Sequence, residues 1–281
     1  MSVSISLALM VLASFQQTDT TIAVSPNARL DLTNHAGLIV VSAWDRDAIR
    51  VRAEHGSRDR IVIESRGSVV TIRARRRYGR SLAVDYELTV PATMSLSLDG
   101  IEAEIEVTGV HGDISAETIE GDIVVRRGGS MNLSTIEGDI HVEGATGRVR
   151  AHGVDGDIDI RDVTGDVTAE TIDGDVTLDG IDASDVDVST VDGDLFYRGS
   201  IRDGGRYRFT SHDGDVTLAV PTTINATVSV ATFDGEFEAG PAFRVQISAA
   251  RPGRRFSFVL GTGSARVELE SFDGLIQLRR Q

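Results

Sequence analysis

Pairs of carboxylates are the residues of this chain whose type and spacing could support chemistry. An acid, a glycine and a second acid recur along the sequence, as in Asp155-Gly156-Asp157. Ca²⁺ takes six to eight oxygen ligands, and stacked carboxylates could supply part of such a shell. The acids that form this candidate cation stripe are Asp155, Asp157, Asp173, Asp175, Asp192, Asp194, Asp213 and Asp215.

The calcium interpretation has a simpler alternative. The repeats lack the Gly-Gly-x-Gly-x-Asp core of nine-residue calcium repeats, and Asp beside Gly is common in turns without any metal. Carboxylates stacked about 4.8 Å apart repel each other by roughly 1 kcal/mol per pair in water. They must therefore be hydrated, hydrogen-bonded to N–H groups, or bridged by cations. We favour a hydrated negative stripe, and we assign no catalytic residue and no cofactor.

The acids belong to a longer repeated phrase: a small residue or Thr, an apolar residue, an acid, Gly, an acid and an apolar residue. Eight copies run from residues 118–123 to residues 271–276. In the regular part the phrase glycines lie 17, 18 and 18 residues apart, at Gly121, Gly138, Gly156 and Gly174. A weaker glycine series lies between them, at Gly112, Gly129, Gly147 and Gly165. The unit is therefore about nine residues, and two units make one lap.

A nine-residue unit holds one short strand and one corner, because apolar and polar residues alternate within it. Corners that recur at constant spacing require each lap to stack on the previous one. We therefore predict an all-β parallel β-solenoid, a single-stranded β-helix, with right-handed laps of about 18 residues that widen to about 21. The number of sheets per lap is left open.

The phrase also predicts which residues form the core and which form a ladder. The apolar residues before the first acid should form a buried column, consisting of Ile119, Ile136, Val154, Ile172, Val191, Phe233 and Phe272. His212 takes the same position, and Phe residues should fill the later, wider laps. Stacked Thr residues should form a structural ladder, at Thr118, Thr135, Thr171, Thr190 and Thr232.

The two ends of the chain differ from the regular part. Residues 1–14 contain an apolar run typical of a secretory signal peptide, although no basic residue precedes it. Residues 20–95 should form irregular N-terminal laps or a cap, and residues 96–281 regular repeats, within one continuous domain 20–281. The paired Arg279 and Arg280 should protect an exposed terminal strand from aggregation. A groove or cap is expected within residues 239–263, which contain Arg244, Arg251, Arg254 and Arg255.

Composition excludes several classes of function. The chain has no Cys, which excludes disulfides, zinc–thiolate sites and thiol nucleophiles. A formal charge of −15 argues against nucleic acid or anionic lipid as the main partner. No stretch after the leader is long and apolar enough for a membrane helix. None of the six His residues forms a pair with metal-ligand spacing.

Several motifs together resemble a bacterial β-strand-repeat family described as "putative adhesins", similar to the head domains of auto-transporter adhesins. Besides the leader and the repeated Gly-Asp-(Ile/Val), the motifs are Trp44-Asp45-Arg46-Asp47, Leu88-Thr89-Val90-Pro91, Leu218-Ala219-Val220-Pro221 and Ser271-Phe272-Asp273-Gly274. The resemblance covers the chain from about Thr20 to its end. It implies a β-solenoid in the cell envelope or outside the cell, and it carries over no catalytic residue.

These observations predict an exported, acidic, non-enzymatic β-solenoid that acts as an adhesion, binding or envelope-structure module. It would work in the periplasm, on the outer surface or outside the cell. Its partner would be an envelope or extracellular protein or a glycan. We expect no nucleic-acid partner and no membrane span in the mature chain. The alternatives are a carbohydrate-active enzyme on the same scaffold and a scaffold that assembles end to end.

Overall fold

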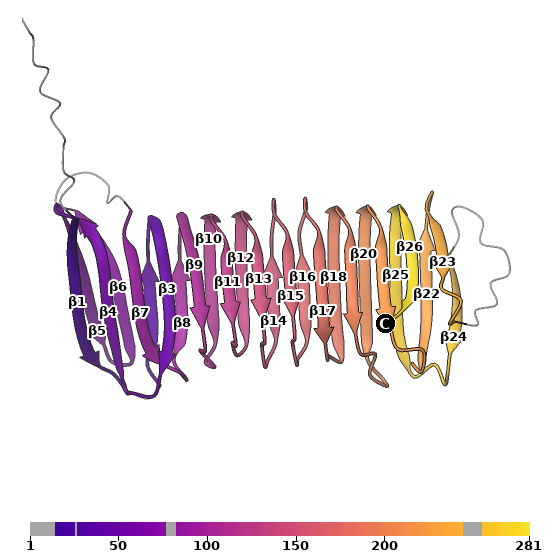
Figure 1. Ribbon diagram of the computed structural model, residues 1–281, viewed down its shortest axis with the longest axis horizontal. Helices are drawn as coiled ribbons and strands as arrows, with labels where there is room; N and C mark the ends of the chain where they lie inside the picture. Colours follow the sequence, from indigo (N-terminus) through magenta and orange to yellow (C-terminus); the bar gives the residue numbers. More distant parts are fainter. Residues whose placement is uncertain (1–14, 26, 77–82, 244–254) are drawn as a thin grey trace, which may run out of the picture.

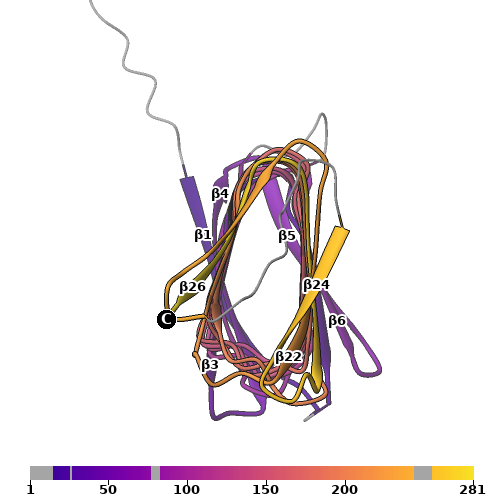
Figure 2. The same cartoon turned by 90° about the vertical axis from the view of Figure 1, so that its right-hand side faces the viewer.

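The computed structural model describes residues 15–25, 27–76, 83–243 and 255–281, and they form an all-β coil with two layers of strands (Figures 1 and 2). The strands lie across the long axis of the molecule, and most neighbours are parallel. In the regular part Ile114 pairs with Met131, Met131 with Val149, and Val149 with Val167. The prediction of a β-solenoid-like fold is therefore confirmed.

The pairings define the order of strands in each layer. The first layer consists, in spatial order, of β5 (Asp59–Arg66), β6 (Val69–Arg76), β2 (Arg29–Thr33), β8 (Ser95–Asp99), β10 (Ile114–Glu120), β12 (Met131–Glu137), β14 (Val149–His152), β16 (Val167–Glu170), β18 (Asp185–Asp192), β20 (Arg206–Asp213), β25 (Ala265–Asp273), β22 (Ala226–Thr232) and β24 (Arg255–Leu260). The second layer consists of β1 (Phe15–Ala23), β4 (Ala48–Gly56), β7 (Asp85–Pro91), β3 (Ala36–Trp44), β9 (Glu102–Thr108), β11 (Ile123–Arg126), β13 (Ile140–Glu143), β15 (Ile158–Arg161), β17 (Val176–Ile181), β19 (Leu195–Gly199), β21 (Val216–Val220), β26 (Leu275–Arg280) and β23 (Glu236–Ala239).

The core lies between the two layers, and alternate residues of each strand point into it. In β10, Ile114, Ala116 and Thr118 are buried while the residues between them face outward. On the second layer one buried column occupies the last position of seven phrases, at Ile123, Ile140, Ile158, Val176, Leu195, Val216 and Ile276. Successive laps thus align equivalent apolar side chains, which is how a repeat protein builds a continuous core.

The predicted buried column was wrong by one residue. Ile119, Ile172 and their equivalents are among the exposed large hydrophobic residues, and His212 is exposed as well. Thr118, Thr135, Thr171 and Thr190 take the inward position, whereas Thr232 is only half-buried. Strict alternation therefore directs the residue after each buried Thr outward. A charged substitution such as Ile172→Asp should therefore leave the stack intact.

A matched pair of substitutions tests this assignment. Ile172→Val should change the free energy of unfolding by less than about 0.5 kcal/mol, because the side chain is half exposed. Ile158→Val should cost about 0.5–1.5 kcal/mol, because Ile158 is buried in the column of the second layer. Denaturant unfolding of both variants measures the difference. A larger cost for Ile172→Val than for Ile158→Val would contradict the observed burial.

Aromatic side chains divide between the core and the surface in the last laps. Tyr197, Tyr207 and Phe209 are buried, and the rings of Tyr197 and Phe209 lie 5.1 Å apart. Phe233 and Phe272, which we predicted to lie in the core, are exposed instead. The prediction that large residues fill the later laps therefore holds for Phe209 but not for these two Phe residues.

Laps do not stack in sequence order at either end of the molecule, and at the C-terminal end this contradicts the predicted stacking of each lap on the previous one. At the N-terminal end β2 lies between β6 and β8, and antiparallel pairs join β1 to β4, β4 to β7 and β5 to β6. At the C-terminal end β25 and β26 lie between the laps that precede them, and β24 pairs antiparallel with β22 (Figure 1). The interpretation of Arg279 and Arg280 as protection for a terminal strand is therefore wrong, because β26 is paired on both sides.

A polar cluster holds the turn that leads into this inserted lap. The Ser264 hydroxyl donates to Asp203 Oδ1 at 2.7 Å, and the Asn225 amide donates to the same oxygen at 3.1 Å. These hydrogen bonds hold the pKa of Asp203 below its usual value. Asn225 Oδ1 also accepts a hydrogen bond from the Thr262 N–H. The cluster therefore fastens the loop between β24 and β25 to two neighbouring laps.

Two predictions concern residues outside the described part of the chain. The signal-like segment 1–14 lies outside it, and so do Arg244, Arg251 and Arg254 of the expected groove or cap. Arg255 begins β24 and pairs with Glu270 at 3.8 Å. Within the ranges described above, no helix is long and apolar enough to cross a membrane.

Candidate binding surfaces

The corners of the coil explain why the phrase contains Thr and Gly. The Thr135 hydroxyl donates to the Gly121 carbonyl of the previous lap at 3.2 Å, and Thr190 donates to the Gly174 carbonyl at 3.1 Å. The backbone of Gly174 has φ of 146°, and a Cβ at this position would lie 2.2 Å from the Gly156 carbonyl oxygen. The Thr row is therefore a structural ladder, and only glycine fits the close approach beneath it.

The second acid of each phrase is held by the next lap. Asp157 Oδ1 accepts a hydrogen bond from the Asp175 N–H at 2.8 Å, and Asp175 Oδ1 accepts one from the Asp194 N–H at the same distance. The row of second acids linked in this way consists of Asp122, Asp139, Asp157, Asp175, Asp194 and Asp215. Hydrogen bonds to N–H groups thus offset part of the repulsion within this row.

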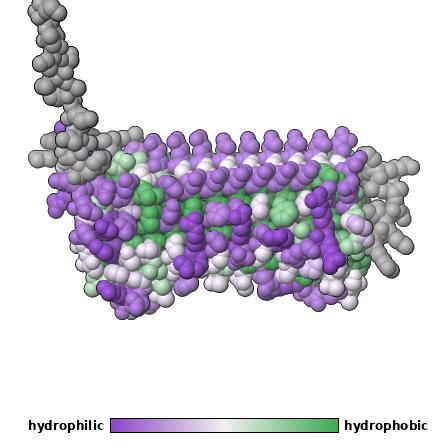
Figure 3. All heavy atoms as spheres, in the orientation of Figure 1, coloured by the Kyte–Doolittle hydropathy of each residue, from purple (hydrophilic) through white to green (hydrophobic). Residues whose placement is uncertain are grey.

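The first acids of the phrases line up beside the second acids and face solvent. Direct pairings join Glu137 to Asp155, Asp155 to Asp173, and Asp173 to Asp192. The structure therefore brings all eight acids of the candidate cation stripe onto one long edge, where Figure 3 shows continuous rows of hydrophilic residues. In the described ranges no group of three or more His, Asp or Glu side chains is arranged to hold a metal ion. Calcium binding stays a prediction.

An exposed apolar row, which we call the edge ladder, follows the same edge. It consists of Ile101, Ile119, Ile136, Val154, Ile172, Val191, His212, Phe272 and Phe233. The eight apolar members are 40–61% exposed. The Phe272 ring stacks on His212 at 4.8 Å and on Phe233 at 4.7 Å. A contiguous apolar row of this kind is typical of an interaction surface.

The sequence pattern identified the residues of the edge ladder other than Ile101, but it placed them in the core. Each ladder residue is followed directly by a first acid, so an apolar row and a carboxylate row run side by side. A contact on this edge would bury aliphatic and aromatic side chains next to negative charge. The arrangement therefore fits a partner that is both apolar and basic.

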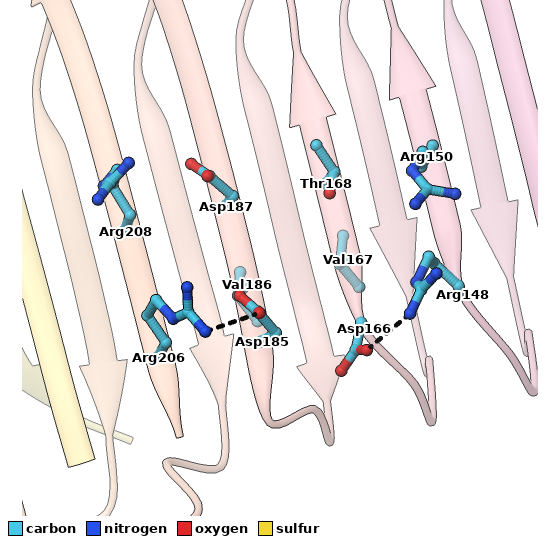
Figure 4. Close-up of a pocket in the computed structure, with 10 residues that line it drawn as sticks. All are labelled: Arg148, Arg150, Asp166, Val167, Thr168, Asp185, Val186, Asp187, Arg206 and Arg208. Atoms are coloured by element: carbon cyan, nitrogen blue, oxygen red, sulfur yellow. Dashed lines mark ion pairs between the residues drawn. The ribbon is translucent and has the colours of Figure 1, made fainter. Parts of the chain in front are cut away.

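The outer face of the first layer carries a hollow of about 350 Å³ (Figure 4). One row across the strands contains Arg148, Asp166, Asp185 and Arg206, with ion pairs of 3.5 Å for Arg148–Asp166 and 3.7 Å for Arg206–Asp185. A parallel row contains Arg150, Thr168, Asp187 and Arg208 (Figure 4). Burial is the main cause that raises the pKa of Asp187. No sequence signal marked this face, because its residues lie on different laps.

Comparisons with known proteins place the chain in a family. The model of the Toastrack DUF4097 family matches residues 27–279. Two solved structures are similar over 95% of this chain: a "putative cell adhesion protein" from Clostridium sporogenes, with 8% identity, a TM-score of 0.25 and 100% of that chain covered, and a "putative adhesin" from Bacteroides fragilis, with 10% identity, a TM-score of 0.44 and 98% of that chain covered. No curated protein matches the sequence.

Proposed function

We propose that this chain, which belongs to the Toastrack DUF4097 family, is a non-enzymatic binding module of adhesion type that contacts its partner through the edge ladder. The observation that carries the proposal is the row of exposed Ile, Val and Phe side chains beside the first acids. Burying such a row on a partner would be favourable, since each square ångström of apolar surface removed from water contributes about 25 cal/mol. The ladder residues repeat once per lap along the coil, and this regular spacing fits an extended partner surface.

The proposal includes export of the chain. Residues 1–14 would serve as a secretory leader, followed by a cap at residues 20–95 and regular repeats at 96–281 within one domain. The laps would be right-handed, about 18 residues long and widening to about 21. The absence of Cys is compatible with an oxidising compartment, and the mature protein would work in the periplasm, on the outer surface or outside the cell.

Binding to isolated bacterial cell envelopes tests the function. We expect the purified chain to sediment with envelopes, and the triple variant Ile136→Asn, Val154→Asn, Ile172→Asn to bind at least tenfold more weakly, because three anchors on the order of 1 kcal/mol each are lost. The matched control is Val259→Asn, which replaces a more exposed apolar residue on β24, away from the ladder.

Two results would count against the proposal. Equal binding of the triple variant and the unmodified chain would exclude the ladder as the contact surface. Release of reducing sugar from envelope polysaccharides by the unmodified chain would show that the chain is a carbohydrate-active enzyme and not a non-enzymatic binding module.

A further inference from the structure

A second surface, independent of the edge ladder, lies on the outer face of the first layer. A hollow of about 510 Å³ crosses β2, β8, β10, β12 and β14. We call it the Arg150 furrow, and its outward-facing polar residues are Arg29, Ser95, Asp113, Ser115, Ser130, Asn132, Arg148 and Arg150. Five adjacent strands about 4.8 Å apart make it roughly 19 Å long.

The furrow exists because short and long side chains alternate along the coil. Ser95, Ser115 and Ser130 form a low floor, and longer arginine side chains bound it on β2 and β14. Arg148 and Arg150 also line the 350 Å³ hollow that continues over β16, β18 and β20. The two hollows therefore adjoin at these arginines, and both are open depressions on the outer face of the first layer.

Arg150 is the one arginine of the furrow that forms no ion pair within the described part of the chain, and the one carboxylate that lines the furrow, Asp113, lies two strands away. Arg148 pairs with Asp166 at 3.5 Å, and Arg29 pairs with Asp31 at 2.6 Å. Glu170, on the neighbouring strand, lies 3.4 Å from the His152 ring. Across the described part of the chain, no carboxylate forms an ion pair with Arg150, and its neighbours along the row are Asn132 and Thr168.

We propose that the Arg150 furrow binds a linear polysaccharide that carries carboxylate groups. A guanidinium forms paired, charge-assisted hydrogen bonds to a carboxylate. The hydroxyls of Ser115 and Ser130 and the amide of Asn132 can both donate to and accept from sugar hydroxyls. An open furrow along the molecule fits a polymer better than a small molecule, which would prefer an enclosed pocket.

The net charge of the molecule does not prevent this binding. Asp113, the one carboxylate that lines the furrow, lies two strands from Arg150, or roughly 10 Å, and the Debye length is about 8 Å at physiological ionic strength. Recognition is therefore local to the furrow. A nucleic acid is the less suitable polyanion, because the residues that line the furrow include no aromatic side chain on which bases could stack.

Calorimetric titration of the full chain with polygalacturonate tests the proposal, with dextran as the neutral polymer. We expect polygalacturonate to bind and dextran to bind at least tenfold more weakly. Arg150→Gln should weaken polygalacturonate binding at least tenfold, the usual effect of losing a charge-assisted hydrogen bond. The matched control, Arg126→Gln, removes an exposed arginine from the second layer and should leave binding unchanged.

A second variant tests the hydrogen-bonding groups of the furrow without changing its charge. Asn132→Leu removes hydrogen-bonding groups from the floor while Arg150 stays, and it should also weaken binding. The proposal is overturned if polygalacturonate binds no tighter than dextran, if Arg150→Gln and Asn132→Leu both bind like the unmodified chain, or if a single-stranded oligonucleotide binds as tightly as polygalacturonate. The edge-ladder triple variant should bind polygalacturonate normally, which separates this proposal from the proposed function.

Discussion

Gly174→Ala should lower the free energy of unfolding by about 3 kcal/mol. A Cβ at this position would lie 2.2 Å from the Gly156 carbonyl oxygen, which is backbone and cannot move away without shifting the lap. Overpacking of this kind costs about 1–3 kcal/mol, and a non-glycine residue at positive φ adds about 1–2 kcal/mol. Denaturant unfolding of the variant measures the sum.

Gly204→Ala is the control that separates the two costs. Gly204 also has positive φ, at 74°, but a Cβ there would have no atom within 4 Å. We expect this variant to show only the backbone cost of about 1–2 kcal/mol. Equal losses in the two variants would mean that the close stacking of corner glycines does not contribute to stability.

Deletion of residues 265–281 should unfold more of the chain than it removes. These residues form β25 and β26, whose buried Val267, Leu269 and Ile276 each contribute roughly 1.5–3 kcal/mol. They also pair with strands on both sides, so β22, β23 and β24 would lose their attachment to the rest of the coil. A terminal lap stacked in sequence order would instead be removed without this effect.

Hydrogen exchange locates the expected loss. The amides of Val228 and Val230 in β22 should lose protection after the deletion, while amides of β14 and β16 keep it, because repeat proteins are stabilised mainly by neighbouring laps. Deletion of Gln281 alone is the control and should leave both regions protected. Retained protection of Val228 and Val230 after the long deletion would contradict the inserted position of β25 and β26.

Glycine spacing was sufficient to predict the solenoid, but it did not define which residue of the phrase points inward. Thr171 and Ile172 are adjacent, so either can be buried, and hydrophobicity alone favours the isoleucine. The structure buries Thr171 because its hydroxyl donates to the Gly156 carbonyl at 3.3 Å, which offsets the cost of burying a polar group. The hydrogen bond between laps therefore determines which of these two residues points inward.

The order of laps at the ends could not be predicted for a different reason. The 39 residues between Gly235 and Gly274 fit two laps, but spacing alone does not indicate which lap lies outermost. That order depends on pairings such as Ser229 with Glu268 and Ser229 with Ser257, which join residues far apart in the sequence. The Arg150 furrow was equally hidden, because its residues come from five separate strands.

Thiol labelling is the most direct test of the outward edge ladder on which the proposed function depends. The chain has no Cys, so a single introduced Cys reports one position. We expect Ile172→Cys to react with a maleimide under native conditions at nearly the rate of the unfolded chain, because this position is 52% exposed. Thr171→Cys, at a buried position, should react more slowly by orders of magnitude. Slow labelling of Ile172→Cys together with fast labelling of Thr171→Cys would show that Ile172 points inward, and would contradict an outward edge ladder.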